Sequence, residues 1–183
     1  MKGHIKKEIR LLGVDDSPFD KFKNDKVLVI GTIFRGGQFL DGLLSTKVHV
    51  DGSDSTKKLI SMINKTKNKP QLQAILMDGI ALGGFNIVDI NQLYEKTKIP
   101  VIVVIRRMPD IENIKSVLKR IGKQNKIKLL EKAGTPIKIR KVYCQLTGLT
   151  KEKAEQILKI ACTHSFIPEP IRAAHIIASG VVK

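Results

Sequence analysis

The segment Ile9–Gly37, IRLLGVDDSPFDKFKNDKVLVIGTIFRGG, decides the fold of this chain. Residues 9–14 form a short apolar run that ends in a turn signal at residues 15–18, so the pattern predicts a strand followed by a turn. Residues 27–34 are continuous and rich in β-branched side chains, as a buried strand should be. The segment therefore predicts two core strands close together at the start of the chain.

A hairpin and then an alternation of strands and helices are expected after this segment. Arg35-Gly36-Gly37 is a hairpin turn signal, so residues 38–50 should return as one strand or two, with Asp41-Gly42 as a candidate bulge. Further strands are predicted at Leu72–Met77 and Val101–Ile105, and less regular ones at Ile127–Leu130 and Ile137–Cys144. Helices are predicted after Ser53 or Asp54, through Ile87, Ile90 and Leu93, after Pro109-Asp110, after Thr150, and from Pro168–Pro170 to just before Gly180.

This order favours an α/β fold, a mixed β-sheet flanked by helices, in a single domain spanning residues 1–183. The ribonuclease H-like architecture has this order, and so do other α/β folds. Cys144 and Cys162 form no zinc-ligand spacing and no disulfide framework. With no secretory signal visible and apolar runs too short to span a bilayer, we expect a cytoplasmic protein and no membrane partner.

The charge balance indicates a polyanionic partner. The chain has 183 residues, and 33 Lys and Arg against 17 Asp and Glu give a formal net charge of +16. An excess of this size favours nucleic acid, DNA or RNA, although ribosomes and anionic membranes also attract basic proteins. A basic cluster spans residues 115–128, and it is either a solvated face or a surface that contacts phosphates.

Three carboxylates follow predicted strands and are candidate metal ligands. Asp15, Asp51 and Asp78 each stand at the end of a strand, at the edge where α/β sheets bind ligands. Oxygen ligands of this kind suit Mg²⁺ or Mn²⁺. The alternative is structural, because Asp is common in turns and helix caps. Asp54 is closer to a cap position, but it can substitute for Asp51.

Two further features add candidate site residues. Arg106 directly follows the strand Val101–Ile105, at the same expected edge, and its guanidinium is suited to binding phosphate. His175 lies on the last predicted helix with Arg172 one turn before it. Taken alone, a histidine on such a helix is more often structural than catalytic.

Five motifs together resemble one family. GVDDSPF (Gly13–Phe19), VDGSD (Val50–Asp54), LMDGIALGGFNIVDI (Leu76–Ile90), PVIVVIRRMPD (Pro100–Asp110) and IPEPIRAAHIIASG (Ile167–Gly180) are similar, in this order, to the archaeal endonuclease dU family, a relative of endonuclease V. The resemblance implies a ribonuclease H-like fold and metal-dependent hydrolysis of a phosphodiester, with deaminated bases as the targets of endonuclease V.

The resemblance also assigns roles. It places metal-binding carboxylates on Asp15 and Asp78, a phosphate-binding cation on Arg106, and an active-site histidine on His175, with Arg172 as a further substrate contact. Endonuclease V has a Glu between its two Asp ligands, for which Asp51 or Asp54 must substitute here. Its Pro-Tyr-Ile-Pro wedge has no counterpart in residues 42–50.

The sequence thus predicts a Mg²⁺- or Mn²⁺-dependent endonuclease acting on DNA or RNA. Asp15, Asp78 and His175 are the expected catalytic residues, and Asp15, Asp51 and Asp78 are the expected metal ligands. A non-catalytic nucleic-acid-binding protein of the same fold is the main alternative, and a ribosome- or partner-associated module is another. The choice between DNA and RNA, the base recognised and the oligomeric state stay open.

Overall fold

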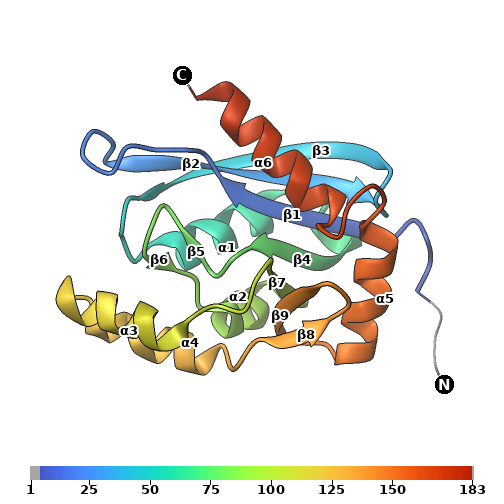
Figure 1. Cartoon of the computed structure of the whole chain (residues 1–183). Coiled ribbons are helices and arrows are strands. Elements are labelled where there is room, and N and C mark those ends of the chain that lie inside the picture. Colours follow the sequence, from blue (N-terminus) through green and yellow to red (C-terminus); the bar gives the residue numbers. More distant parts are fainter. Residues whose placement is uncertain (1–4, 183) are drawn as a thin grey trace.

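The computed structural model describes residues 5–182, which form a mixed seven-stranded sheet with helices on both faces (Figure 1). The strands of this sheet are β1 (Arg10–Asp16), β2 (Lys26–Arg35), β3 (Phe39–His49), β4 (Leu72–Asp78), β7 (Val101–Ile105), β8 (Ile137–Ile139) and β9 (Val142–Thr147). The helices are α1 (Ser55–Lys65), α2 (Ile90–Thr97), α3 (Ile111–Arg120), α4 (Ile127–Lys132), α5 (Lys151–Ala161) and α6 (Glu169–Val181), with 3₁₀ turns at Lys69–Gln71 and Gln124–Lys126. A separate small ribbon pairs β5 (Ala81–Leu82) with β6 (Asn86–Ile87).

The sheet has the order β3-β2-β1-β4-β7-β9-β8. The first three strands form an antiparallel meander, whereas β1, β4 and β7 run parallel at the centre of the sheet. The carboxyl ends of these three parallel strands therefore meet at one edge. The chain reaches Asp15, Asp78 and Arg106 at that edge, as the sequence predicted.

Alternation of side chains along the central strands creates two buried layers. Even-numbered residues of β1 and odd-numbered residues of β4 and β7, such as Leu12, Met77 and Val103, pack with α1 and α2. The other set, which includes Leu11 and Leu76, packs with α5 and α6. Burial on both sides is the reason that these strands are continuous apolar runs in the sequence.

The expected strands at the start and centre of the chain are confirmed, including a register shift in β3 around Asp41-Gly42. Other details differ. Ile127–Leu130 forms most of helix α4 rather than a strand, because a short apolar run has no decisive periodicity and Leu130 packs against Leu118. Ile137–Cys144 bends at Arg140-Lys141 into the hairpin β8–β9.

Two boundary predictions and one capping prediction are also corrected. Ile87 lies in β6, so the expected helix begins only at Ile90, where the side chain of Asp89 caps it. Asp54 occupies the N-cap position of α1 but gives no side-chain capping bond. Gly180 lies inside α6 rather than after it. It is in the exposed last turn of the helix, where an added Cβ would have no neighbouring atom within 4 Å.

Gly13 in β1 sets the position of α6. Its α-carbon faces the start of α6 so closely that an added Cβ would lie 2.2 Å from the carbonyl carbon of Pro170. On the neighbouring strand, the hydroxyl of Thr32 donates a hydrogen bond of 2.6 Å to the Pro170 carbonyl oxygen. The absence of a side chain at Gly13 therefore allows α6 to lie directly on β1 and β2, as Figure 1 shows.

We predict that Gly13→Ala lowers the free energy of unfolding by about 3 kcal/mol, because the new methyl group overlaps backbone atoms that cannot rotate away. Gly42→Ala is the matched control in β3, where an added Cβ meets its nearest atom at 3.6 Å. We expect that control to change stability by less than about 1 kcal/mol. Denaturant unfolding of both variants tests this, and equal stabilities would contradict the close approach of α6.

Candidate active site

Three polar side chains continue the face of the central strands that α5 and α6 cover. Asp15 follows Leu11 and Gly13 at two-residue spacing, and Asp78 follows Leu76 in the same way. Because Val14 pairs with Met77 in the parallel register, the next residues, Asp15 and Asp78, are neighbours at the strand ends. Both therefore point to the same side of the sheet.

Arg106 completes this row from β7. It follows Ile102 and Val104 on the same face, and its Nη2 lies 3.5 Å from Oδ2 of Asp78. The Arg106 side chain is more than half exposed. The guanidinium thus lies beside the carboxylates and is open to a phosphate from solvent.

Helix α6 adds His175 to the row. Nδ1 of His175 lies 2.8 Å from Oδ2 of Asp15, and the other oxygen of that carboxylate accepts a hydrogen bond of 2.9 Å from the Asp16 amide. Asp15 is almost fully buried, whereas the imidazole is half exposed. The carboxylate therefore orients the ring through Nδ1 and leaves Nε2 free to meet a substrate or water.

The environment of Asp15 disfavours its negative charge. Burial, followed by the nearby charge of Asp78, raises the pKa of Asp15 from 3.8 to about 6, although the Asp16 amide and His175 oppose the shift. Burial also raises the pKa of Asp16. Carboxyl groups with raised pKa values at a sheet edge are a common sign of a functional site.

Asp16 points to the opposite face and organises a loop that the sequence analysis did not assign to the site. Its Oδ2 accepts a hydrogen bond of 2.9 Å from the amide of Gly83, in the turn between β5 and β6. Gly83 and Gly84 both have positive φ angles, which glycine adopts without strain. The Asp15-Asp16 pair thus places one carboxylate on each face, the first at His175 and the second at this turn.

Asp51 and Asp54 lie with the turn rather than with Asp15. Oδ1 of Asp51 accepts a hydrogen bond of 2.7 Å from the amide of Phe85, and the Asp51 amide donates to Gly83. Asp54 accepts hydrogen bonds from Asn86 and His49. Both carboxylates are engaged in holding the β5–β6 ribbon to the end of β3.

The predicted ligand set of Asp15, Asp51 and Asp78, with Asp54 as substitute, is consequently not gathered in one place. Within residues 5–182, no three His, Cys, Asp or Glu side chains form a group that could hold a metal ion by themselves. The physical reason is that successive side chains of β1 point to opposite faces of the sheet. Asp51 contacts the β5–β6 turn on the face of Asp16, whereas Asp15 and Asp78 face α6. Two carboxylates and an imidazole remain at the candidate site.

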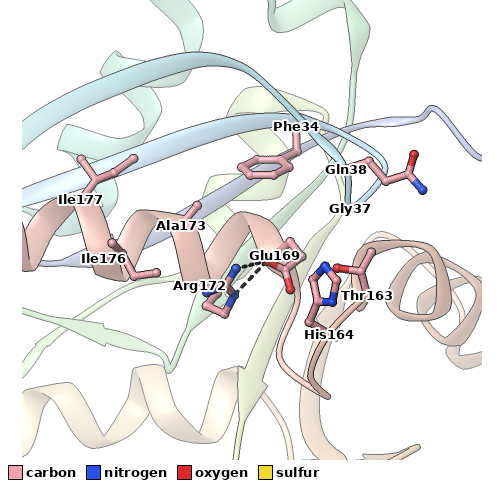
Figure 2. A pocket seen from close by; sticks show the side chains of 10 residues that line it. All are labelled: Phe34, Gly37, Gln38, Thr163, His164, Glu169, Arg172, Ala173, Ile176 and Ile177. Carbon is pink, nitrogen blue, oxygen red and sulfur yellow. Dashed lines mark hydrogen bonds and ion pairs between the residues drawn. The ribbon is translucent and has the colours of Figure 1, made fainter.

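Arg172 pairs with a carboxylate of its own helix (Figure 2). Its Nε and Nη2 lie 2.8 and 2.7 Å from Oε2 of Glu169, one turn earlier in α6. One cation of the basic cluster is also paired with carboxylates of the chain, since Lys115 contacts Glu112 and Glu131. The role of Arg172 in substrate binding stays a prediction.

Lys126 is a buried cation that sequence reasoning missed. Its ammonium donates hydrogen bonds to the carbonyl oxygens of Asp51, Gly52 and Phe85. Burial, followed by the charge of Lys123, lowers the pKa of Lys126. A single ammonium thus ties the β3–α1 turn to the β5–β6 ribbon, and no spacing rule distinguishes it from the exposed lysines around it.

The fold is shared with nucleases. Endonuclease V of Bacillus subtilis superposes with a TM-score of 0.63 at 12% identity, covering 97% of this chain and 83% of that chain. Endonuclease V of Ciona intestinalis, solved in complex with a 24-mer DNA containing inosine, gives 0.57 at 17% identity, covering 90% and 82%. The mixed sheet with its flanking helices is a ribonuclease H-like fold, as the sequence analysis expected.

Closer relatives define the family. Residues 7–182 match endonuclease dU. A UPF0215 protein of Methanothermobacter thermautotrophicus is 48% identical over 182 residues, covering 97% of this chain and 89% of that protein. The crystal structure of a protein of unknown function from Archaeoglobus fulgidus superposes with a TM-score of 0.88 at 41% identity, covering 94% of this chain and 98% of that one. The chain belongs to the endonuclease dU family.

None of the helices within residues 5–182 has the length and apolar character needed to cross a membrane.

We predict that the Asp15 carboxyl titrates at about pH 6 in metal-free buffer. Because the folded state then holds a proton that the unfolded state has lost, the contribution of Asp15 to stability decreases as the pH rises from 3.8 to about 6. Carboxyl ¹³C NMR measures the pKa directly. Asp78→Asn should lower it, since one negative neighbour is removed, and an unchanged value would show that the two carboxylates are not electrostatically coupled.

Lys126→Met should cost about 3 kcal/mol of unfolding free energy, because the carbonyl oxygens of Gly52 and Phe85 lose the ammonium donor and that of Asp51 keeps only Lys123. Lys128→Met is the matched control, since Lys128 is exposed two residues further along the same segment. We expect that control to stay within about 0.5 kcal/mol of the wild type. Thermal or urea unfolding compares the two variants, and similar losses would show that the hydrogen bonds of Lys126 to the three carbonyl oxygens do not stabilise the fold.

Proposed function

We propose that this protein is a metal-dependent endonuclease that hydrolyses a phosphodiester of DNA or RNA at the Asp15–Asp78–His175 row. The observation that carries the proposal is the contact of 2.8 Å between His175 and Asp15, beside Asp78 at the carboxyl end of two parallel strands. Membership of the endonuclease dU family supports the same reaction class.

The donor set suits a hard divalent cation, Mg²⁺ or Mn²⁺. Mg²⁺ sites in phosphoryl-transfer proteins commonly use one or two carboxylates and complete the coordination with water and substrate phosphate. Asp15 and Asp78 would hold the ion, because a positive charge would offset both the repulsion between the two carboxylates and the free-energy cost of burying a charged Asp15. Asp51 and Asp54 are not required in this arrangement. When bound, the ion supplies positive charge to the phosphoryl oxygens as the reaction proceeds.

The residues of the chain supply the remaining chemistry. The Asp15 carboxylate accepts a hydrogen bond from the Nδ1–H of His175, so Nε2 carries the free lone pair of the ring and can accept a proton from the attacking water. Water adds to phosphorus as the bond from phosphorus to the leaving oxygen breaks, and the leaving oxygen takes a proton from solvent water, which yields one phosphate end and one hydroxyl end. Arg106 would bind the phosphate, and its exposed guanidinium, 3.5 Å from Asp78, supports this role.

Substrate attraction follows from the charge of the whole chain. A net charge of +16 concentrates polyanions near the surface and makes their binding sensitive to salt. Endonuclease V relatives of this fold have been solved with inosine-containing DNA. A deaminated base is thus a reasonable first substrate for this protein, with DNA or RNA as the backbone.

A non-catalytic nucleic-acid-binding protein is the second candidate. The observation that favours it is the lack, among the described residues, of a third acid grouped with Asp15 and Asp78. In that case the fold and the positive charge would serve binding alone, and Asp15 would serve only to fix α6 through His175.

The experiment is cleavage of inosine-, uracil- and undamaged oligonucleotides, each as DNA and as RNA, with Mg²⁺, with Mn²⁺ and with EDTA. Wild type should cleave only with metal. Asp78→Asn should reduce the cleavage rate by at least about a hundredfold, and metal titration should show weaker binding, because an amide neutralises no cation charge. Nucleic-acid binding in EDTA should persist.

Asp51→Asn is the matched control, because it makes the same chemical change and keeps the oxygen that accepts from Phe85. Retained activity in this variant supports the two-carboxylate site, whereas a loss equal to that of Asp78→Asn would restore Asp51 as a ligand. Binding without cleavage in the wild type under every metal condition would favour the non-catalytic alternative.

A further inference from the structure

The loop that joins β1 to β2, residues 17–25, extends beyond the sheet at the end of β1 where Asp15 lies (Figure 1). Its residue Phe22 is 86% exposed, the largest exposed fraction among the large hydrophobic residues that the structure describes. An apolar ring left in water adds nothing to the core. The ring of Phe22 is therefore available to a partner from solution.

Hydrogen bonds within the loop restrict the position of Phe22. Oδ1 of Asp20 accepts a hydrogen bond of 2.9 Å from the Phe22 amide, and Oδ1 of Asn24 accepts one of 2.8 Å from the Asp20 amide. The Asn24 amide donates in return to the carbonyl oxygen of Asp20, also at 2.8 Å. Because the turn is already closed by these bonds, a ligand that binds the ring has less conformational entropy to remove.

A second phenyl ring attaches the loop to the edge of the candidate site. Phe19 packs against the buried core and lies beside Gly84, where an added Cβ would be 3.6 Å from Cζ of Phe19. Asp16, three residues earlier, accepts its hydrogen bond from Gly83 in the same β5–β6 turn. Asp16 and Phe19 thus anchor the loop at this edge, and Phe22 takes no part in that anchoring.

Cations surround the exposed ring. Lys21, Lys23 and Lys26 are all exposed, and Nζ of Lys21 lies 5.0 Å from the centroid of the Phe22 ring. Lys23 pairs with Asp20 at 3.7 Å, a surface contact of little strength. Because Phe22 stays 86% exposed with Lys21 beside it, its ring keeps an open face. The loop therefore presents a flat apolar surface next to positive charge.

We propose that Phe22 stacks on a base in a single-stranded segment of the nucleic-acid substrate, while Lys21 and Lys26 contact neighbouring phosphates. Surfaces that bind single strands combine these two features, because every base has a flat apolar face and every nucleotide carries a negative charge. An anionic lipid surface also attracts lysines, but it is bound through a broad apolar face, and this loop offers one ring.

This inference rests on the proposed function and adds a contact to it. Phe22 follows Asp15 by seven residues, so their Cα atoms are at most about 25 Å apart. One nucleic-acid strand advances about 3.4 Å per nucleotide. The stacked base would therefore lie within about seven nucleotides of the phosphate at the carboxylate row, and the contact would hold the strand beside the site without taking part in hydrolysis.

The test is binding of a single-stranded DNA of about 16 nucleotides to the metal-free protein in EDTA, so that it does not depend on cleavage. Fluorescence anisotropy of the labelled DNA measures the Kd at several salt concentrations. Phe22→Ala should weaken binding by at least about fivefold at each salt concentration, because stacking on one base is lost. The slope of log affinity against log salt should not change, because the charge is unchanged.

Phe39→Ala is the matched control. Phe39 is also an exposed phenyl ring beside a cation, with Arg35 at 5.5 Å from its centroid. The pairing of Arg10 with Arg35 places it at the opposite end of β1 from Asp15, so we expect this variant to bind like the wild type. Phe22→Trp should retain the affinity, since indole also stacks on bases, whereas Phe22→Leu should bind like Phe22→Ala. Thermal unfolding checks that each variant is folded.

Two further measurements separate charge from stacking. Lys21→Gln should make the salt slope shallower by about 0.7, because one phosphate contact with a single strand is lost. An oligonucleotide of the same length with abasic sites throughout supplies the phosphates without the bases. Phe22→Ala should leave its affinity unchanged, and an equal loss for the abasic and the normal strand would overturn the stacking contact.

Other outcomes distinguish this inference from the proposed function. Equal binding of the normal strand by folded Phe22→Ala and by wild type would overturn the stacking contact, and cleavage by that wild type would leave the endonuclease intact. A loss of affinity for vesicles of anionic lipid, but not for DNA, would overturn it in favour of a membrane contact. Base-dependent binding through Phe22 in a protein that cleaves with no metal would support the contact and remove the endonuclease.

Discussion

The direct contact of α6 with β1 at Gly13 is the constraint on which the site depends. A side chain at this position would occupy the space of the Pro170 backbone, so only glycine allows the helix to lie on the strand. Two residues further along the same strand face, Asp15 then meets His175, which is five residues further along the helix. A packing requirement and the central contact of the candidate site are therefore set by the same crossing of helix and strand.

The strand alternation explains how adjacent aspartates serve two purposes. Asp15 faces α6 and takes part in the candidate site, whereas Asp16 faces the β5–β6 turn and binds the amide of Gly83. The same alternation aligns Asp78 and Arg106 with Asp15 on one face. The opposite face is stabilised by Asp51 and by the buried ammonium of Lys126, so the polar groups of the sheet edge divide into a candidate-site side and a structural side.

The charge pattern of this edge is consistent with a protein that handles phosphodiesters. Two coupled carboxylates accumulate negative charge where the neighbouring Arg106 and the rest of the chain are positive. In the proposed function, a divalent cation at these carboxylates would reduce the repulsion that a polyanion meets there.

The sequence by itself determined the sheet strands near Asp15 and Asp78, the α/β class and the family, because continuous apolar strands and ordered motifs are local signals. Tertiary structure decided which carboxylates meet. Asp51 follows a strand in the sequence just as Asp15 does, but its contacts run to the other face. The burial of Lys126 and the helical state of Ile127–Leu130 likewise depend on groups distant in the chain. No local spacing encodes the face of the sheet on which a loop residue finally lies.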